Sequence, residues 1–266
     1  MALFKYLPPE RVDNLEKERI AITPPDRFND AFELRPRVPS PSPNYLEKAV
    51  KEASEQERQE SPDLFRGVDS GLVSEVEKDL IKGIVSGAVP YADHFQDSLQ
   101  SESSKHFGIL CLSAVNNQEL MWGLYANGHR GFVIEFDCNQ SAFRQLGKPW
   151  KVEYSEKPPI YDLEKPSDEF WRVKHTRWQH EAEYRIIRPL PACKPETQED
   201  RQVVYFCDLP RTCVKAVYFG HRIAPEIRNR ILKVVVGPAT SKFDAILDRE
   251  DCVVSFKEIT DGAAIR

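Results

Sequence analysis

Long hydrophobic runs are missing from this sequence, and none approaches the roughly 20 apolar residues that a membrane-spanning helix needs. The first residues, Met1–Pro8, are too short and too soon charged to form the apolar core of a secretory signal. The six cysteines form no C-x-x-C pair, and no His/Cys spacing resembles a structural zinc site. We therefore expect a cytoplasmic protein with reduced thiols, no membrane partner and no bound metal.

An excess of positive charge is also missing. The net charge of −5 argues against a protein held on nucleic acid by a broad basic field. The sequence contains no P-loop, G-x-G-x-x-G, G-x-S-x-G or H-E-x-x-H motif. Cys111 has no evident histidine partner, which disfavours thiol catalysis. A metal-dependent nuclease is disfavoured too, because no Asp/Glu/His cluster with ligand spacing stands out.

What the chain does contain is a series of short apolar segments separated by turns. Together they predict an α+β fold with a mixed, mainly antiparallel sheet, in a single domain over residues 1–266. The expected strands are 4–6, 19–23, 107–113, 132–137, 151–154, 181–187, 203–206, 214–220, 244–248 and 252–256. The expected helices are 8–15, 119–126, 170–178 and 225–235.

Residues 40–104 have a different character. Pro and Ser open the segment, and Glu, Lys and Gln then dominate, with apolar residues at helical spacing such as Leu72, Val76 and Leu80. We interpret this segment as a helical insertion within the domain.

The segment from His180 to Ile187 offers the most informative polar pattern. On a strand, Glu181, Glu183 and Arg185 share one face, because side chains repeat every two residues. Two carboxylates beside an arginine need solvent, partners or a ligand. The cations around them suit an anionic ligand such as a pyrophosphate, or else form the basic outer face of a helix. Those cations are Arg172, Lys174, His175, Arg177, His180 and Arg188.

A second group begins at Trp122 and Tyr125 and continues into the turn N127-G-H-R-G131. The turn places His129 and Arg130 beside aromatic residues, in a corner that suits an anion or a ring. The alternative is purely structural, because two glycines permit a tight helix-to-strand turn. The segment Asp26–Glu33 is expected to be structural, with an Asx-type turn anchored by Phe28 and Phe32.

Five blocks, in this order, resemble a widespread bacterial family known as domain of unknown function 2971. The resemblance runs from Phe4 to about Gly220 and is interrupted by the helical segment. Ala31 departs from the family pattern, which usually has Pro there. The blocks are F28-N-D-A-F-E33, C111-L-S113, L120-M-W-G-L-Y-A126, H129-R-G-F-V-I-E-F136 and W178-Q-H-E-A-E-Y-R185.

A looser similarity links three short pieces to ADP-ribosyltransferases. L3-F-K-Y6 looks like their opening strand, with Lys5 in place of the usual His or Arg. L112-S113 looks like their middle strand carrying a hydroxyl, and E181-A-E183 resembles their E-x-E motif. The similarity implies an ADP-ribosyltransferase-like fold and NAD as substrate.

In this interpretation Glu183 holds a ribose hydroxyl and stabilises the oxocarbenium-like transition state. Glu181 serves the acceptor, Arg185 or Arg130 meets the pyrophosphate, and Tyr125 or Trp122 stacks on a ring. The expected cofactor-binding residues are Lys5, Tyr6, Ser113, Trp122, Tyr125, His129, Arg130 and Arg185.

The expected reaction is transfer of ADP-ribose from NAD to a macromolecular acceptor, as in a bacterial toxin or defence effector. One alternative is NAD hydrolysis without an acceptor. The other is a non-catalytic ligand- or partner-binding module, in which Glu181 and Glu183 pair with arginines inside the protein.

Overall fold

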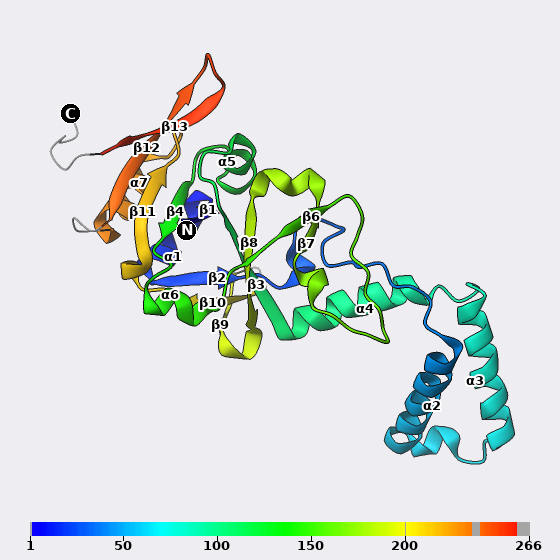
Figure 1. Cartoon of the computed structure of the whole chain (residues 1–266). Coiled ribbons are helices and arrows are strands. Elements are labelled where there is room, and N and C mark those ends of the chain that lie inside the picture. The colour runs from blue at the N-terminus through cyan, green and yellow to red at the C-terminus, as the bar shows by residue number, and fades with distance from the viewer. Residues whose placement is uncertain (1, 200, 236–239, 260–266) are drawn as a thin grey trace. The chain divides into compact units, whose positions relative to one another are not determined.

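The computed structural model describes residues 2–199, 201–235 and 240–259 (Figure 1). The chain separates into two compact units. Unit 1 consists of Met1–Glu33, Ser103–Glu156 and Lys174–Arg266, and unit 2 consists of Leu34–Glu102 and Lys157–Val173. The second unit therefore takes in a later segment, 157–173, in addition to the helical segment expected from the sequence.

An eight-stranded sheet forms the centre of unit 1, with the order β13-β12-β11-β4-β1-β3-β8-β5. Neighbouring strands are antiparallel except β11 and β12, which are parallel. The sheet is thus mixed and mainly antiparallel, as the sequence predicts. Its strands are β1 (Leu3–Leu7), β3 (Phe107–Ser113), β4 (Phe132–Phe136), β5 (Trp150–Lys151), β8 (Glu183–Pro189), β11 (Val214–Phe219), β12 (Ser241–Asp248) and β13 (Val253–Glu258).

Both faces of this sheet are covered, and the alternation of side chains shows how. Leu3 and Leu7 of β1 belong to one hydrophobic cluster, whereas Phe4 and Tyr6 belong to another. The first cluster adds residues of β2 (Arg19–Ile22) and of three helices, which cover that face: α1 (Val12–Glu16), α6 (Ser141–Leu146) and α7 (Pro225–Val234). The second adds Met121 and Trp122 of α5 (Glu119–Tyr125).

Two smaller sheets complete unit 1. The strands β2, β10 (Val203–Asp208) and β9 (Lys194–Thr197) form a three-stranded antiparallel sheet. The strands β6 (Glu153–Ser155) and β7 (Val173–His175) form a two-stranded sheet. Short 3-10 helices connect these strands: η1 (Pro9–Arg11), η2 (Pro25–Arg27), η5 (Thr176–Glu181), η6 (Leu190–Ala192) and η7 (Arg211–Cys213).

Unit 2 is mainly helical, and its helix starts follow from the sequence. Pro43 stands at the start of the first long helix, where Ser42 Oγ accepts a hydrogen bond from Tyr45 N at 3.3 Å. The Asp69 carboxylate caps the next helix through Gly71 N at 2.9 Å. The elements are α2 (Pro43–Glu60), η3 (Pro62–Phe65), α3 (Ser70–Val85), η4 (Glu169–Trp171) and α4 (Tyr91–His106), whose last residues belong to unit 1.

Two segments bear on the sequence interpretation: helix α3 of unit 2, and the stretch 170–178, which runs from unit 2 into unit 1. The apolar stripe Leu72, Val76 and Leu80 of α3 is 42–61% exposed, whereas Ile84 on the same helix is buried. The helix expected over 170–178 is wrong: η4, β7 and η5 occupy that stretch. The β-branched Val173 and Thr176 favour extended backbone there over a continuous helix.

The turn between α5 and β4 depends on the close approach of two backbones. A Cβ added at Gly131 would lie 2.0 Å from Leu7 O, so only glycine fits. At Gly123, within α5, an added Cβ meets nothing within 4 Å.

We predict that Gly131→Ala lowers the free energy of unfolding by about 1–3 kcal/mol or more, because the new methyl group displaces β1. Gly123→Ala, the matched control, should be neutral or stabilising by up to about 1 kcal/mol, because alanine favours helix. Chemical denaturation of both variants measures the difference. Equal stability of the two would contradict the close approach.

Candidate functional site

A cavity of about 360 Å³ in unit 1 brings together residues from distant parts of the chain. Six of the residues singled out in the sequence line it, namely Lys5, Tyr6, Ser113, Tyr125, Glu181 and Glu183. The remaining lining residues are Phe4, Thr23, Arg27, Phe28, Asn29, Glu33, Cys111, Leu112, Met121, Leu124 and Lys174.

Glu183 begins β8 and pairs with a fully buried arginine on the same strand. Arg185 Nε donates to Glu183 Oε1 at 3.0 Å, and its Nη2 donates to Oε2 at 3.0 Å. The two side chains share a strand face because they are two residues apart. The antiparallel register sets Glu183 opposite Ser113 and Arg185 opposite Cys111 of β3. The result is a bidentate ion pair between two side chains of the central sheet.

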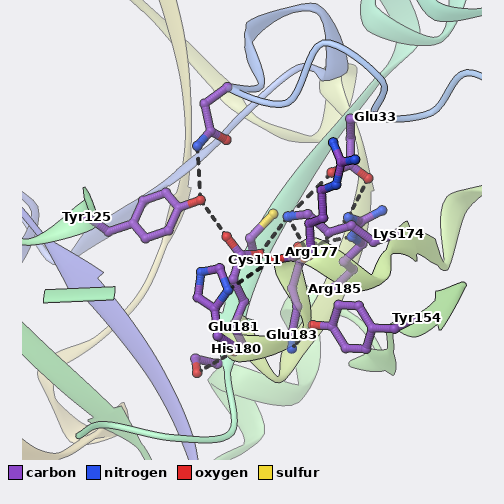
Figure 2. Close-up of polar contacts among 12 residues, drawn as sticks. Glu33, Cys111, Tyr125, Tyr154, Lys174, Arg177, His180, Glu181, Glu183 and Arg185 are labelled. Carbon is purple, nitrogen blue, oxygen red and sulfur yellow. Dashed lines mark hydrogen bonds and ion pairs between the residues drawn. The ribbon is translucent and has the colours of Figure 1, made fainter. Parts of the chain in front are cut away.

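Lys174 of β7 joins three carboxylates at this point, as Figure 2 shows. Its Nζ lies 2.6 Å from Glu181 Oε2, 3.2 Å from Glu183 Oε2 and 3.4 Å from Glu33 Oε2. Glu33 Oε1 also accepts a hydrogen bond from Arg185 Nη2 at 2.6 Å. We call these five residues, Glu33, Lys174, Glu181, Glu183 and Arg185, the ion cluster. Each is at most 8% exposed.

Glu181 reaches the ion cluster from outside the strand, and here the sequence interpretation is wrong. Glu181 ends η5, and β8 begins only at Glu183. Ala182 between them has φ 44°, in the left-handed region, so the chain turns between the two carboxylates. Ser113 Oγ fixes this turn by donating to Glu181 O at 2.7 Å.

Three polar side chains surround the ion cluster. Tyr125 OH donates to Glu181 Oε1 at 2.6 Å, and Asn29 Nδ2 donates to Tyr125 OH at 3.1 Å. On the other side, Tyr154 OH accepts from Glu183 N at 2.8 Å. The Tyr125 hydroxyl orients the Glu181 carboxylate, whereas Tyr154 holds the backbone of Glu183. Burial raises the pKa of Tyr154 to about 12 and also raises that of Tyr125, an effect that Glu181 strengthens.

The electrostatics of the ion cluster separate its carboxylates. Burial raises the pKa of Glu183, but the charges of Arg185 and Lys174 outweigh burial and lower it to about 2. For Glu33 burial prevails over the same two cations, and its pKa is raised. Glu183 therefore remains ionised at neutral pH. A buried, oriented carboxylate on a cavity wall can stabilise positive charge that develops in a ligand.

Two cations that line the same cavity form no ion pair with a carboxylate in the described part of the chain. Lys5 Nζ donates to Cys111 O at 2.9 Å, and Arg27 Nη1 donates to Val203 O at 2.6 Å. The cavity therefore combines carboxylates with cations whose charge is not balanced by an ion pair, an arrangement that suits a ligand with both positive and negative groups.

A second cavity, of about 550 Å³, adjoins the first. Lys5, Tyr6, Thr23, Leu124 and Tyr125 line both. Its other walls include Glu10, Arg11 and Asn14. The Asn14 carboxamide oxygen is buried and has no hydrogen-bond partner among residues 2–199, 201–235 and 240–259. The two cavities therefore share part of one wall, and each is of the size of a small-molecule site.

Four residues that the sequence assigned to ligand binding line neither cavity: Arg185, which is engaged in the ion cluster, and Trp122, His129 and Arg130. Trp122 is fully buried, and its Nε1 donates to Asn116 O at 2.8 Å. His129 stacks on Trp122 with ring centroids 5.3 Å apart, and its Nε2 lies 3.0 Å from the Glu119 carboxylate. Arg130 is exposed, and its Nη1 contacts Asn127 O at 3.4 Å. The aromatic corner is thus packed into the core.

Sequence reasoning missed several residues that the structure places at the site. Glu33 lies in the segment that was expected to be only structural. The Asx-type turn is there, with Asp30 Oδ1 accepting from Phe32 N at 2.9 Å, but Phe32 is 80% exposed and anchors nothing. Lys174 was expected either to meet an anionic ligand or to lie on the basic outer face of a helix, whereas it is buried and pairs with carboxylates of the protein. The basic residues around Glu183 were the available signal for Lys174, whereas nothing in the sequence marked Glu33.

Comparisons with protein-family models, curated proteins and solved structures found no match to the chain. Within residues 2–199, 201–235 and 240–259, no helix is long and apolar enough to cross a membrane. The same ranges hold no group of three or more His, Cys, Asp or Glu side chains arranged to hold a metal ion.

The opposite pKa shifts of Glu183 and Glu33 predict opposite pH dependence for two isosteric variants. Glu183 contributes stability that is present above its ordinary pKa and is lost as pH falls toward its folded value of about 2. Glu183→Gln should therefore cost about 3–5 kcal/mol near neutral pH, because it leaves Arg185 and Lys174 underpaired, and cost less in acid.

The pKa of Glu33 is raised, so its contribution to the free energy of unfolding falls as pH rises through its ordinary pKa and above. Relative to wild type, Glu33→Gln should therefore become less costly at higher pH. Denaturant unfolding at about pH 7 and about pH 3.5 compares the two variants. The same pH trend in both would contradict the separation of the two carboxylates.

Proposed function

We propose that unit 1 binds NAD as a substrate and transfers its ADP-ribose to a macromolecular acceptor, with Glu183 as the central carboxylate. The observation that carries the proposal is the cavity wall. An oriented, ionised Glu183 stands there beside Glu181, while Lys5 and Arg27 offer positive charge in the same space. NAD has the matching pattern, a cationic nicotinamide ring and an anionic pyrophosphate.

The chemistry asks for a carboxylate in this setting. Breaking the bond between nicotinamide and ribose develops positive charge on the sugar, as in glycoside cleavage. Glu183 would hold a ribose hydroxyl and stabilise that charge, and Arg185 and Lys174 hold Glu183 in one orientation. Arg185 is engaged in the ion cluster and Arg130 lies outside both cavities, so Lys5 and Arg27 take the pyrophosphate role in this proposal.

Glu181 would serve the acceptor. Its carboxylate contacts Tyr125 and Lys174 and reaches the cavity from the turn preceding β8. When water occupies the acceptor position, the same site hydrolyses NAD. The looser resemblance to ADP-ribosyltransferases supports this proposal, including the extension to a toxin or defence effector.

A non-catalytic ligand-binding module is the second candidate, and one observation favours it. Both carboxylates are paired inside the protein, Glu183 with Arg185 and Lys174, and Glu181 with Lys174. This is the arrangement expected when the ion cluster only stabilises the fold. The two candidates differ in whether bound NAD is consumed.

We predict that the protein releases nicotinamide from NAD in the presence of a cell lysate as acceptor. Glu183→Gln should lower this rate by about a hundred- to thousand-fold, because transition-state charge stabilisation is lost. Lys5→Met should weaken NAD binding, whereas the matched control Arg130→Met should not. Nicotinamide release and calorimetric titration measure the two effects, with thermal melts to monitor folding.

The outcomes of this experiment separate the two candidates. NAD binding without nicotinamide release would leave the non-catalytic module. If the wild-type protein neither binds nor consumes NAD, the enzyme proposal fails and a non-catalytic module for another ligand or partner takes its place. An equal loss of binding in Lys5→Met and Arg130→Met would contradict the placement of the pyrophosphate in the cavity.

A further inference from the structure

Two buried cysteines in unit 1 lie side by side, and neither lines the cavity at the ion cluster. Cys193 directly follows η6, and Cys207 lies on β10. In the β9–β10 register Lys194 pairs with Phe206, so Cys193 and Cys207 lie next to each other on two adjacent antiparallel segments. Their Sγ atoms are 3.3 Å apart, and the residues are 8% and 7% exposed. A disulfide requires about 2.0 Å, so only a small movement separates this pair from a bond.

A cavity of about 240 Å³ gives access to one of the two sulfur-bearing residues. Cys207 lines it together with Arg188, Gln145, Leu146 and Phe206, whereas Cys193 does not. Arg188 Nη1 donates to Gln145 O at 3.0 Å, and its buried Nε has no hydrogen-bond partner in the described part of the chain. A small reagent in this cavity, which Arg188 also lines, would meet Cys207 before Cys193.

The two thiols are not equivalent. Burial raises the pKa of Cys193, contact with Cys207 raises it further, and Arg188 opposes the shift only in part. Cys193 therefore stays a thiol, and its Sγ lies 3.7 Å from Pro189 O. Since Cys207 lines the cavity and Cys193 does not, the first reaction with a reagent in the cavity belongs to Cys207.

We propose that Cys207 and Cys193 form an oxidation site for small hydroperoxides, with Cys207 as the attacking residue and Cys193 as the resolving one. In the first step the Cys207 thiolate attacks the peroxide oxygen. An S–O bond forms, the O–O bond breaks, and the leaving alkoxide or hydroxide takes up a proton. Cys207 becomes a sulfenic acid.

In the second step Cys193 sulfur attacks the oxidised Cys207 sulfur. The S–S bond forms, the S–O bond breaks, and the hydroxide leaves with the proton of Cys193 as water. The thiol pair loses two electrons, and the hydroperoxide is reduced to an alcohol (or to water) plus water. A low-molecular-weight thiol reverses the modification by exchange.

The bond would join the residue between η6 and β9 to the end of β10. It closes the β9–β10 hairpin and ties β10 to the turn after β8, the strand that carries Glu183 and Arg185. The inference does not depend on the proposed NAD chemistry, because none of the residues involved lines the cavities at the ion cluster.

The test is peptide mapping of the full chain after treatment of the reduced protein with hydrogen peroxide. Trypsin cuts after Arg185, Arg201 and Arg211 but not before Pro189 or Pro195, so the two cysteines fall in different peptides, 186–201 and 202–211. We expect these peptides to become cross-linked with the loss of two hydrogens. The oxidised protein should also melt several degrees higher, because the bond closes a loop.

Two single variants separate the roles, and Cys252→Ser is the matched control because Cys252 is exposed. Cys193→Ser should trap a sulfenic acid on Cys207 that reacts with dimedone, whereas Cys207→Ser should give no dimedone adduct on Cys193. Cys252→Ser should cross-link like wild type. Separate, uncross-linked 186–201 and 202–211 peptides in oxidised wild type would overturn the proposal. A dimedone adduct on Cys193 but not on Cys207 would overturn the assigned order of attack.

Discussion

The buried guanidinium of Arg185 is the constraint on which this site depends. A fully desolvated cation is tolerated only with nearby carboxylates in good geometry. Glu183 supplies two hydrogen bonds from the same strand, and Glu33 supplies a third from a segment 152 residues away in the sequence. This pairing constrains three parts of the fold at once. They are the position of β8 in the central sheet, the course of the chain after η2, and the position of β7.

Lys174 adds a second cation and a further carboxylate to this arrangement. With Arg185 alone, two carboxylates would be enough, but Lys174 draws in Glu181 and leaves three carboxylates around two cations. The three carboxylates and Lys174 line the cavity, as do Lys5 and Arg27. Apolar residues of similar volume would stabilise a fold at least as well as buried ion pairs do. The burial of these ionisable side chains beside a cavity is therefore consistent with the proposed ligand site.

The sequence predicted the strands well because their apolar alternation reflects the two covered faces of one sheet, as in β1 and β4. It also identified Glu181 and Glu183, although by assuming one continuous strand, which Ala182 interrupts. The basic residues around Glu183 included Lys174, but the carboxylates that Lys174 pairs with could not be predicted. The role of Glu33 could not be predicted either, because it comes from contacts across the fold that local patterns do not encode. Trp122 and His129 show the converse: an aromatic cluster that resembled a ring-binding corner was needed to fill the core.

The place of β1 in the middle of the sheet bears on how the chain folds during synthesis. Its first residues pair with β3 and β4, so Phe4 meets Ser113 and Glu135 only after more than a hundred further residues have been made. Until then β1 is an apolar segment with two unpaired edges, the kind of segment that invites wrong pairing. The helices of unit 2 are local structures that can form during this interval. During this delay β1 is the kind of exposed apolar segment that chaperones bind on a nascent chain.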